Sequence, residues 1–263
     1  MSLAAPARQY VWLCSVMGTL LMVQPAARAD DLPQGWSGKG QAGYVMSRGN
    51  SDTDAANVKL DLSLLRRDWK YSLDLDGLFG RSSGITSAER WDARQQSDYQ
   101  ITAGLFTFGA LSYQDDRFSG FQYQATGSAG LGYKFLDSET TKLAAQVGVG
   151  YRSLRPEILL KDDAGRVYAR IPQPTQSEAV GTTGLDFMHQ FNASTKLTDK
   201  LITESGSSNT SIRNDLSLEV KMNKKLALAA GFSVSENTNP PAPLKRTDTI
   251  STLNLVYAFP EPK

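Results

Sequence analysis

The sequence predicts an all-β fold: a transmembrane up-and-down antiparallel β-barrel of about 12 strands. Three observations predict it. Apolar and polar residues alternate with period two over long segments, tight and long connections alternate between these segments, and aromatic residues gather near the segment ends. Successive residues of a β-strand point to opposite faces, so the alternation gives each strand one apolar and one polar face.

The segments with period-two alternation are longer than the strands of most soluble proteins. Alternate apolar residues run through 58–64, 71–79, 123–135, 143–151, 212–222, 226–234 and 253–259. Counting all such segments gives about twelve strands of ~10 to 15 residues, against ~5 to 6 in globular sheets. A soluble β-sandwich also alternates, so strand length and the layout of the connections favour the barrel.

The connections between the predicted strands alternate between tight and long. Tight connections are expected at residues 66–68, 102–105, 137–140, 192–194 and 223–224, and long ones at 48–52, 81–88, 115–120, 155–176, 205–209 and 236–245. Barrels of the bacterial outer membrane have short periplasmic turns and longer external loops. This layout predicts a barrel with both termini on the periplasmic side.

Aromatic residues are expected to form two girdles around the barrel. At the tight-turn ends lie Trp36, Trp69, Tyr71, Tyr99, Phe106, Phe108, Tyr133, Phe135, Phe187, Phe191, Tyr257 and Phe259, and near the long-loop ends Tyr44, Phe79, Trp91, Tyr123, Tyr151 and Phe232. Amphipathic rings settle at headgroup depth in a bilayer. The sheet should close, because an open edge in hydrocarbon leaves backbone N–H and C=O groups unpaired.

Residues 1–29 are expected to be a signal peptide. Arg8 supplies the positive charge, an apolar stretch runs over residues 11–23, and Ala27-Arg28-Ala29 fits a small-x-small cleavage site. The apolar stretch is too short for a single transmembrane anchor, which is the competing interpretation. Cleavage after Ala29 leaves residues 30–263 as the barrel, exported to the bacterial outer membrane.

Composition and charge exclude several classes of protein. The chain has 263 residues, 28 Lys plus Arg, 27 Asp plus Glu and a mean hydropathy of −0.34, so it is too polar for a bundle of membrane-spanning helices. The near-neutral balance does not suggest a nucleic-acid partner, which calls for a clustered basic surface. Cys14 is the only cysteine, and its removal with the signal peptide leaves no disulfide and no thiolate metal ligand.

Five short motifs carry a family resemblance. They are Arg48-Gly49-Asn50-Ser51-Asp52-Thr53, Asp115-Asp116-Arg117-Phe118-Ser119-Gly120-Phe121, Ala129-Gly130-Leu131-Gly132-Tyr133, Glu204-Ser205-Gly206-Ser207-Ser208-Asn209-Thr210, and the closing run from Asp248-Thr249 to Tyr257-Ala258-Phe259. They resemble the salt-induced outer-membrane protein family, catalogued as domain of unknown function 481. The resemblance runs from about Trp36 to Phe259. It implies an outer-membrane barrel placed by the barrel insertion machinery, in contact with outer-membrane lipid and lipopolysaccharide, and it implies no known reaction.

The predicted inward faces carry both signs of charge. The candidates to line the lumen are Lys59, Asp61, Lys70, Asp74, Asp76, Arg90, Arg94, Asp98, Arg213, Asp215, Glu219 and Lys221. Such charges can cross-link a closed interior, or they can line a narrow pore for small solutes. Small inward residues at Ser128, Gly130, Gly132, Gly148, Gly150, Ala227, Ala229 and Gly231 are expected to leave room along the wall. The longest connection, residues 155–176, could fold into that space as a constriction.

A lipid-active, phospholipase-like enzyme is the alternative from another class. His189 is the only histidine, and such an enzyme needs a serine within hydrogen-bond reach of it. His189 lies among girdle aromatics, where an interfacial ring is the ordinary explanation, so we predict no catalytic residue and no cofactor. Asp115-Asp116 and Asp162-Asp163 lack the spaced oxygen ligands of a calcium loop, so no metal site is predicted. A surface-loop binding protein is the remaining alternative.

Overall fold

The computed structural model describes residues 35–48, 53–82, 85–117, 119–162, 167–241 and 244–259. The predicted signal peptide and residues 260–263 lie outside them. The strands of the described residues are β1 (Gly35–Arg48), β2 (Thr53–Arg66), β3 (Trp69–Ser82), β4 (Ile85–Gln100), β5 (Leu105–Asp116), β6 (Phe121–Asp137), β7 (Thr141–Lys161), β8 (Val167–Pro172), β9 (Gln176–Gln190), β10 (Thr195–Gly206), β11 (Thr210–Lys221), β12 (Leu226–Asn237) and β13 (Thr247–Phe259).

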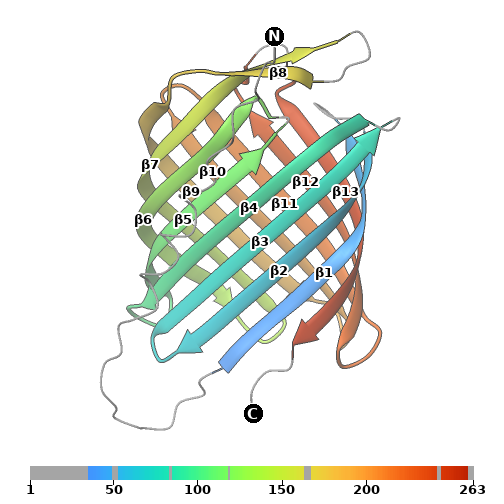
Figure 1. Cartoon of the computed structure of the whole chain (residues 1–263). Helices are drawn as coiled ribbons and strands as arrows, with labels where there is room; N and C mark the ends of the chain where they lie inside the picture. The colour runs from blue at the N-terminus through green and yellow to red at the C-terminus, as the bar shows by residue number, and fades with distance from the viewer. Residues whose placement is uncertain are drawn as a thin grey trace, which may run out of the picture. The chain divides into compact units, whose positions relative to one another are not determined.

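The strands form a closed antiparallel barrel (Figure 1). Strand order is β6-β5-β4-β3-β2-β1-β13-β12-β11-β10-β9-β7-β8, and an additional pairing of β6 with β7 closes the ring. Strand β8 pairs only with the far end of β7, so the wall described here has twelve strands. The predicted all-β barrel is confirmed. No helix long and apolar enough to cross a bilayer occurs in the described part of the chain.

Period-two alternation explains why each strand has two unlike faces. Val58 of β2 and Phe79 of β3 are exposed on the outside of the barrel. Lys59 of β2 and Asp76 of β3 lie on the opposite faces of these strands and form an ion pair inside the barrel. Val149 of β7 is the most exposed of the outward apolar side chains, at 75%. An apolar side chain on the outside of a small barrel has no protein core to enter, so this face is suited to lipid rather than to water.

Most of the predicted girdle aromatics face outward, but two do not. Rings pack together on the outside near the turn ends, as in the Trp69–Tyr71 and Tyr257–Phe259 pairs. Phe106 and Phe108 instead point inward from β5 and are buried, with 7% and 4% exposure. Their assignment to the outer girdle was therefore wrong, because the alternation in β5 places them on the inward register.

The tight connections lie where the sequence predicts them, at the bottom of the barrel in Figure 1, which we call the turn end. The opposite connections, at what we call the loop end, vary more than predicted. Strands β3 and β4 extend to Ser82 and from Ile85, and only residues 207–209 separate β10 from β11. Two connections that were predicted to be long are therefore short, because the strands continue into them.

The predicted constriction at residues 155–176 is instead a hairpin. Strand β7 continues to Lys161, and β8 pairs back along it with Ile158 opposite Ile171. The hairpin lies at the loop end of the barrel (Figure 1). Its backbone needs no partner from the lumen, since the two strands satisfy each other's hydrogen bonds.

Candidate functional site: the barrel lumen

All twelve predicted lumen residues occupy inward positions of their strands. They belong to β2 (Lys59, Asp61), β3 (Lys70, Asp74, Asp76), β4 (Arg90, Arg94, Asp98) and β11 (Arg213, Asp215, Glu219, Lys221), and they alternate with outward neighbours such as Leu75, Trp91 and Leu218. The structure joins most of them into ion pairs, described below. Lys70 lies opposite Asp98 in the strand register, and Lys221 is exposed near the turn end.

Two ion pairs cross the full width of the lumen. Arg213 Nη1 of β11 lies 3.8 Å from Asp92 Oδ1 of β4, and Lys200 Nζ of β10 lies 3.6 Å from Asp74 Oδ2 of β3. In the ring of strands, β4 and β11 are six places apart, as are β3 and β10. Six places in a ring of twelve is diametrically opposite, so these side chains bridge the barrel through its centre.

The Arg213–Asp92 partners are also held on their own walls, at shorter distances. Asp92 Oδ2 forms an ion pair with Arg90 Nε at 2.8 Å, and its Oδ1 accepts a hydrogen bond from the Gln114 amide at 2.8 Å. Arg213 Nε donates to Asp215 at 2.9 Å, and Lys59 pairs with Asp76 at 3.0 Å nearby. Coulomb attraction weakens with distance, so the wall contacts are the firmer ones and the crossing contact is the one that parts first.

Three further ion pairs lie in the lumen, and one of them, between Lys39 and Glu219, joins strands that are not sheet neighbours. Lys39 of β1 pairs with Asp61 at 3.7 Å and with Glu219 at 3.6 Å, and Glu219 also pairs with Lys196 at 3.5 Å. Residues that the sequence reasoning missed are therefore Lys39, Asp92, Lys196 and Lys200. The signal was present, because Lys196, Thr198 and Lys200 alternate with apolar Leu197 and Leu201.

The small inward residues were predicted to leave open space along the wall. In the structure, side chains from neighbouring strands fill that space. A Cβ on Gly132 would meet the Phe106 ring, and one on Gly148 would come within 2.9 Å of Phe108 Cζ. Ala227 and Ala229 are buried against Val256. The glycines and alanines therefore make room for inward side chains of neighbouring strands, and this part of the wall is packed.

At the loop end, the Asp115–Gly120 motif lies against three other segments. Arg117 pairs with Glu89 at 2.7 Å, and Arg170 of β8 donates to the Arg117 carbonyl at 2.6 Å. Gly120 has a φ of +79°, and a Cβ there would come within 2.6 Å of Leu244 Cδ1 in the connection between β12 and β13. That connection lies across the ring from β5 and β6, so it reaches over the mouth.

The motif 204–210 surrounds a buried arginine. Arg152 of β7 is 1% exposed, and its Nη2 donates to Glu178 Oε1 at 2.5 Å and to the Asn209 carbonyl at 2.6 Å. Glu178 also accepts from Ser207 and Ser208, while Glu204 accepts from Thr126 at 2.9 Å. This network fixes the short connection between β10 and β11 onto β7 and β9.

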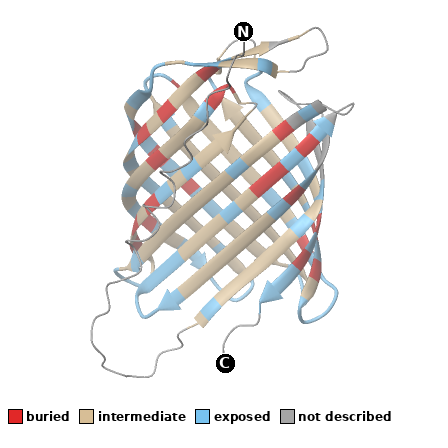
Figure 2. Cartoon of the chain, viewed as in Figure 1, coloured by how far each residue is buried: buried red, intermediate tan, exposed pale blue. Residues whose placement is uncertain are grey.

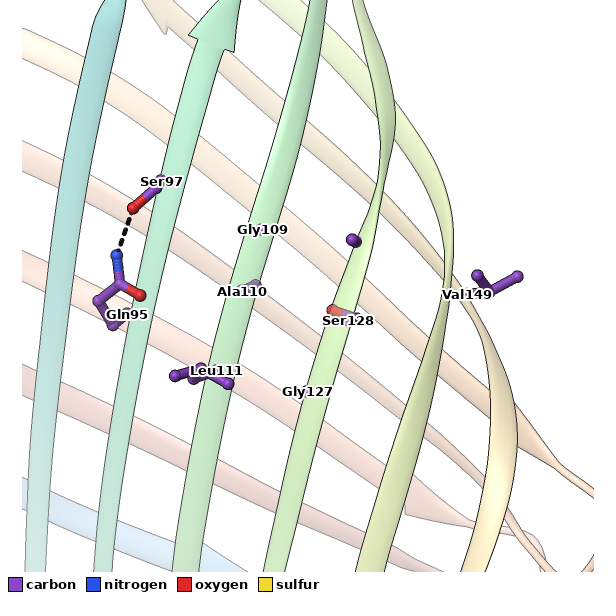
Figure 3. A pocket seen from close by; sticks show the side chains of 9 residues that line it. Gln95, Ser97, Gly109, Ala110, Leu111, Gly127, Ser128 and Val149 are labelled. Atoms are coloured by element: carbon purple, nitrogen blue, oxygen red, sulfur yellow. Dashed lines mark hydrogen bonds between the residues drawn. The ribbon is translucent and has the colours of Figure 1, made fainter. Parts of the chain in front are cut away.

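The outer wall has a shallow depression of about 540 Å³ over β4 to β7 (Figure 3). Gln95 and Ser97 line it beside Gly109, Gly127 and the apolar Leu111, and the Gln95 amide donates to Ser97 Oγ at 2.7 Å. A second polar pair lies on the outward register of β10 and β11, where Asn214 Nδ2 donates to Asp199 Oδ1 at 2.7 Å. These two pairs place polar groups on the outward face.

His189 has the surroundings of an interfacial ring. Its Nδ1 lies 2.9 Å from Thr141 Oγ1, and its ring packs edge-on against Phe191 with centroids 4.8 Å apart. The phospholipase-like alternative gains no support from these contacts. Within the described residues, no group of three or more His, Cys, Asp or Glu side chains is arranged to hold a metal ion.

Comparison with known proteins gives related sequences and folds. "Uncharacterized protein YdiY" of Escherichia coli (strain K12) is 23% identical over 226 residues, which is 85% of this chain and 83% of that protein. Among solved structures, the NanC porin is similar with a TM-score of 0.51 at 9% identity, over 83% of this chain and 98% of that one. The KdgM porin has a TM-score of 0.45 at 11% identity, over 84% and 99%.

The likeness to NanC shows that the fold is that of outer-membrane barrels, and it shows nothing further. The sequence also matches the family described as "Protein of unknown function, DUF481" over residues 40–259. Because this match spans most of the chain, including the strands that carry the lumen charges, the protein belongs to the DUF481 family.

Proposed function

We propose that this protein is a narrow channel of the bacterial outer membrane for small hydrophilic solutes, closed in the described conformation by ion pairs across its lumen. The observation that carries the proposal is the pair of bridges Arg213–Asp92 and Lys200–Asp74. The barrel would be inserted from the periplasm with its turn end inside.

The dimensions of the barrel support a channel that side chains can close. Twelve strands ~4.8 Å apart and tilted ~40° enclose a backbone diameter of roughly 24 Å. Extended lysine and aspartate side chains do not span that diameter, so the 3.6 Å contact between Lys200 and Asp74 places the two walls closer together here than in a circular barrel. The side chains of this pair are 39% and 30% exposed, so water reaches the space around them.

The test replaces the two bridging cations, Lys200 and Arg213, by short uncharged side chains and measures ion conductance. Purified wild-type protein in a planar bilayer should show rare, small steps of conductance in KCl. The double variant Lys200→Ser/Arg213→Ser removes both long side chains, so we expect steps several-fold larger and more frequent. Lys225→Ser is the matched control, because Lys225 is exposed in a tight turn outside the lumen, and it should behave as the wild type.

Silence of the double variant would contradict the channel. Insertion must first be shown by the slower migration of the heated protein, compared with the unheated barrel, in a detergent gel. A well-inserted double variant that passes no current would favour the second candidate, a structural component of the envelope. The mouth supports that candidate, because the β12–β13 connection and the β7–β8 hairpin both pack onto the Asp115–Gly120 motif.

A separate prediction concerns the stability of variants at Asp199 and Asn214, whose side chains lie on the outer wall that we place in lipid. Replacing both by leucine removes a polar pair from hydrocarbon, so the free energy of unfolding should rise by about 1 kcal/mol. Asn214→Leu alone takes the donor from Asp199 and should lower it. Urea unfolding in lipid vesicles measures both variants, and a double variant less stable than the wild type would show that this face does not lie in lipid.

A further inference from the structure

We propose that the centre of the lumen is a binding site for a small zwitterion, whose anionic group takes the place of Asp74 at Lys200 and whose cationic group takes the place of Lys200 at Asp74. This inference rests on the proposed channel function and names its solute class. The juxtaposition that carries it is Lys200 and Asp74, facing each other across the barrel at 3.6 Å.

Both bridges have the same polarity. The cations Lys200 and Arg213 come from the neighbouring strands β10 and β11, and the acids Asp74 and Asp92 come from the neighbouring strands β3 and β4. One side of the lumen therefore offers two positive groups to the centre, and the opposite side offers two negative groups.

The two bridges differ in what remains when they part. Arg213 and Asp92 keep closer partners on their own walls, namely Asp215 and Arg90. Lys200 and Asp74 make their ion pair with each other. In the strand register, Lys200 lies beside Asp186 and Asp215. Asp74 lies beside Asp61 and Arg94. Parting this bridge therefore separates two charges that no closer ion pair holds among the described residues.

The chemistry of the solute follows from that separation. A neutral solute between Lys200 and Asp74 leaves both charges without their ion-pair partner, and a singly charged solute pairs with only one of them. Because these side chains are 39% and 30% exposed, water compensates part of the loss, and an unpaired charge is disfavoured less than a fully buried one would be. A zwitterion pairs with both at once, so it can enter the bridge without leaving an unpaired charge.

The remaining titratable groups around the site keep it close to neutral. Lys70 lies opposite Asp98, Lys39 pairs with Asp61, and Arg213 pairs with Asp215. The last two neighbours, Asp186 beside Lys200 and Arg94 beside Asp74, carry opposite charges. The Gln96 amide contacts both Asp98 and Gln146 at 2.8 and 3.2 Å. This neutral surround favours neither a simple anion nor a simple cation over a molecule that carries both charges.

Vesicle swelling with two isomeric solutes tests the site. β-Alanine and lactamide contain the same atoms, but only β-alanine is a zwitterion. Vesicles containing the wild-type protein, corrected for protein-free vesicles, should admit β-alanine about fivefold faster than lactamide, the factor that ~1 kcal/mol of pairing gives. Lys200→Gln/Asp74→Asn keeps side-chain size and removes both charges, so the ratio should fall to about one.

The matched control is Lys142→Gln/Asp137→Asn. It removes an exposed ion pair between the adjacent strands β6 and β7 at the turn end, and the β-alanine preference should persist. Equal rates in the wild type, or a preference that survives Lys200→Gln/Asp74→Asn, would overturn the zwitterion site. KCl conductance of the same preparation separates the two proposals, because current without preference refutes only the site, whereas absence of current in Lys200→Ser/Arg213→Ser refutes the channel.

Discussion

Arg152→Leu is expected to lower the free energy of unfolding of the barrel by about 3–5 kcal/mol, the range found when one partner of a buried ion pair is removed. Arg152 is almost fully buried, and Glu178 beside it has only 10% of its side chain exposed. Leucine fills much of the volume but leaves the Glu178 carboxylate without its cation. It also leaves the Asn209 carbonyl without its donor.

The loss should be concentrated at the loop end of β7, β9 and β10. Arg152 is the centre of a network in which Glu178 accepts from Ser207 and Ser208, and Glu204 lies 4.0 Å from Arg152 Nη1. Without the guanidinium, two acids face each other with no positive charge between them. The connection at 207–209 then loses the group that holds it, so protease access to this connection should increase along with the loss of stability.

Unfolding in urea, followed by the gel shift between folded and unfolded barrel, measures the change. Arg155→Leu is the matched control on the same strand, because Arg155 Nε donates to the Gln173 carbonyl at 3.2 Å and forms no ion pair among the described residues, and it should cost below about 1 kcal/mol. Arg152→Lys keeps the charge and should fall between the two. Equal effects of Arg152→Leu and Arg155→Leu would contradict the central role of Arg152.

The fold could be predicted because every step of it is local. Alternation in a segment such as 226–234 fixes which face is apolar, and a tight connection such as 223–224 fixes the antiparallel neighbour. Closure then follows from the cost of an open edge in hydrocarbon. The pairing of β1 with β13 and of β6 with β7 completes the ring that this reasoning requires.

The lumen charges could be predicted as a set but not as pairs. Lys59 and Asp76 lie opposite each other on neighbouring strands, and a register argument reaches them. Arg213 and Asp92 are on opposite sides of the barrel, and their meeting depends on tilt, stagger and the flattening of the ring, which are global quantities. For the same reason, the sequence could not separate a bridged lumen from an open one.

The inward packing of Phe106 and Phe108 was mispredicted because an aromatic residue near a strand end fits either a girdle or a core. A signal was available on the neighbouring strands. Gly130 and Gly132 of β6 and Gly148 of β7 are inward glycines at the same level of the barrel. An inward glycine leaves room for a bulky side chain from the next strand. Counting them as empty space ignored that protein interiors are close-packed.

That packing makes Gly130→Ala the second large effect expected in this barrel. A Cβ on Gly130 would strike the Val147 carbonyl oxygen of β7 and come within 2.9 Å of the Phe108 ring. The carbonyl belongs to a strand in the ladder with β6, so it cannot move without disturbing that ladder. We expect a loss of about 1–3 kcal/mol from overpacking, at the upper end because backbone is involved.

Gly109→Ala is the control for the chemistry of the substitution itself. Gly109 lies on β5 and faces outward, and nothing lies within 4 Å of a Cβ placed there. Replacing such a glycine restricts the unfolded chain, so the variant should be unchanged or about 0.4–1 kcal/mol more stable. Urea midpoints of the two variants should therefore move in opposite directions, and a shared direction would show that strand propensity rather than packing governs both.

A third variant separates the contribution of the Phe108 ring to the Gly130→Ala effect from the contribution of the Val147 backbone carbonyl. Phe108→Leu in the Gly130→Ala background removes the ring edge but leaves the Val147 carbonyl in place, so stability should recover only in part. Full recovery would assign the whole clash to the ring. In that case β7 is free to shift, and the inward glycines serve the two phenylalanines alone; partial recovery means that Gly130 also sets how closely β6 and β7 approach at this level of the wall.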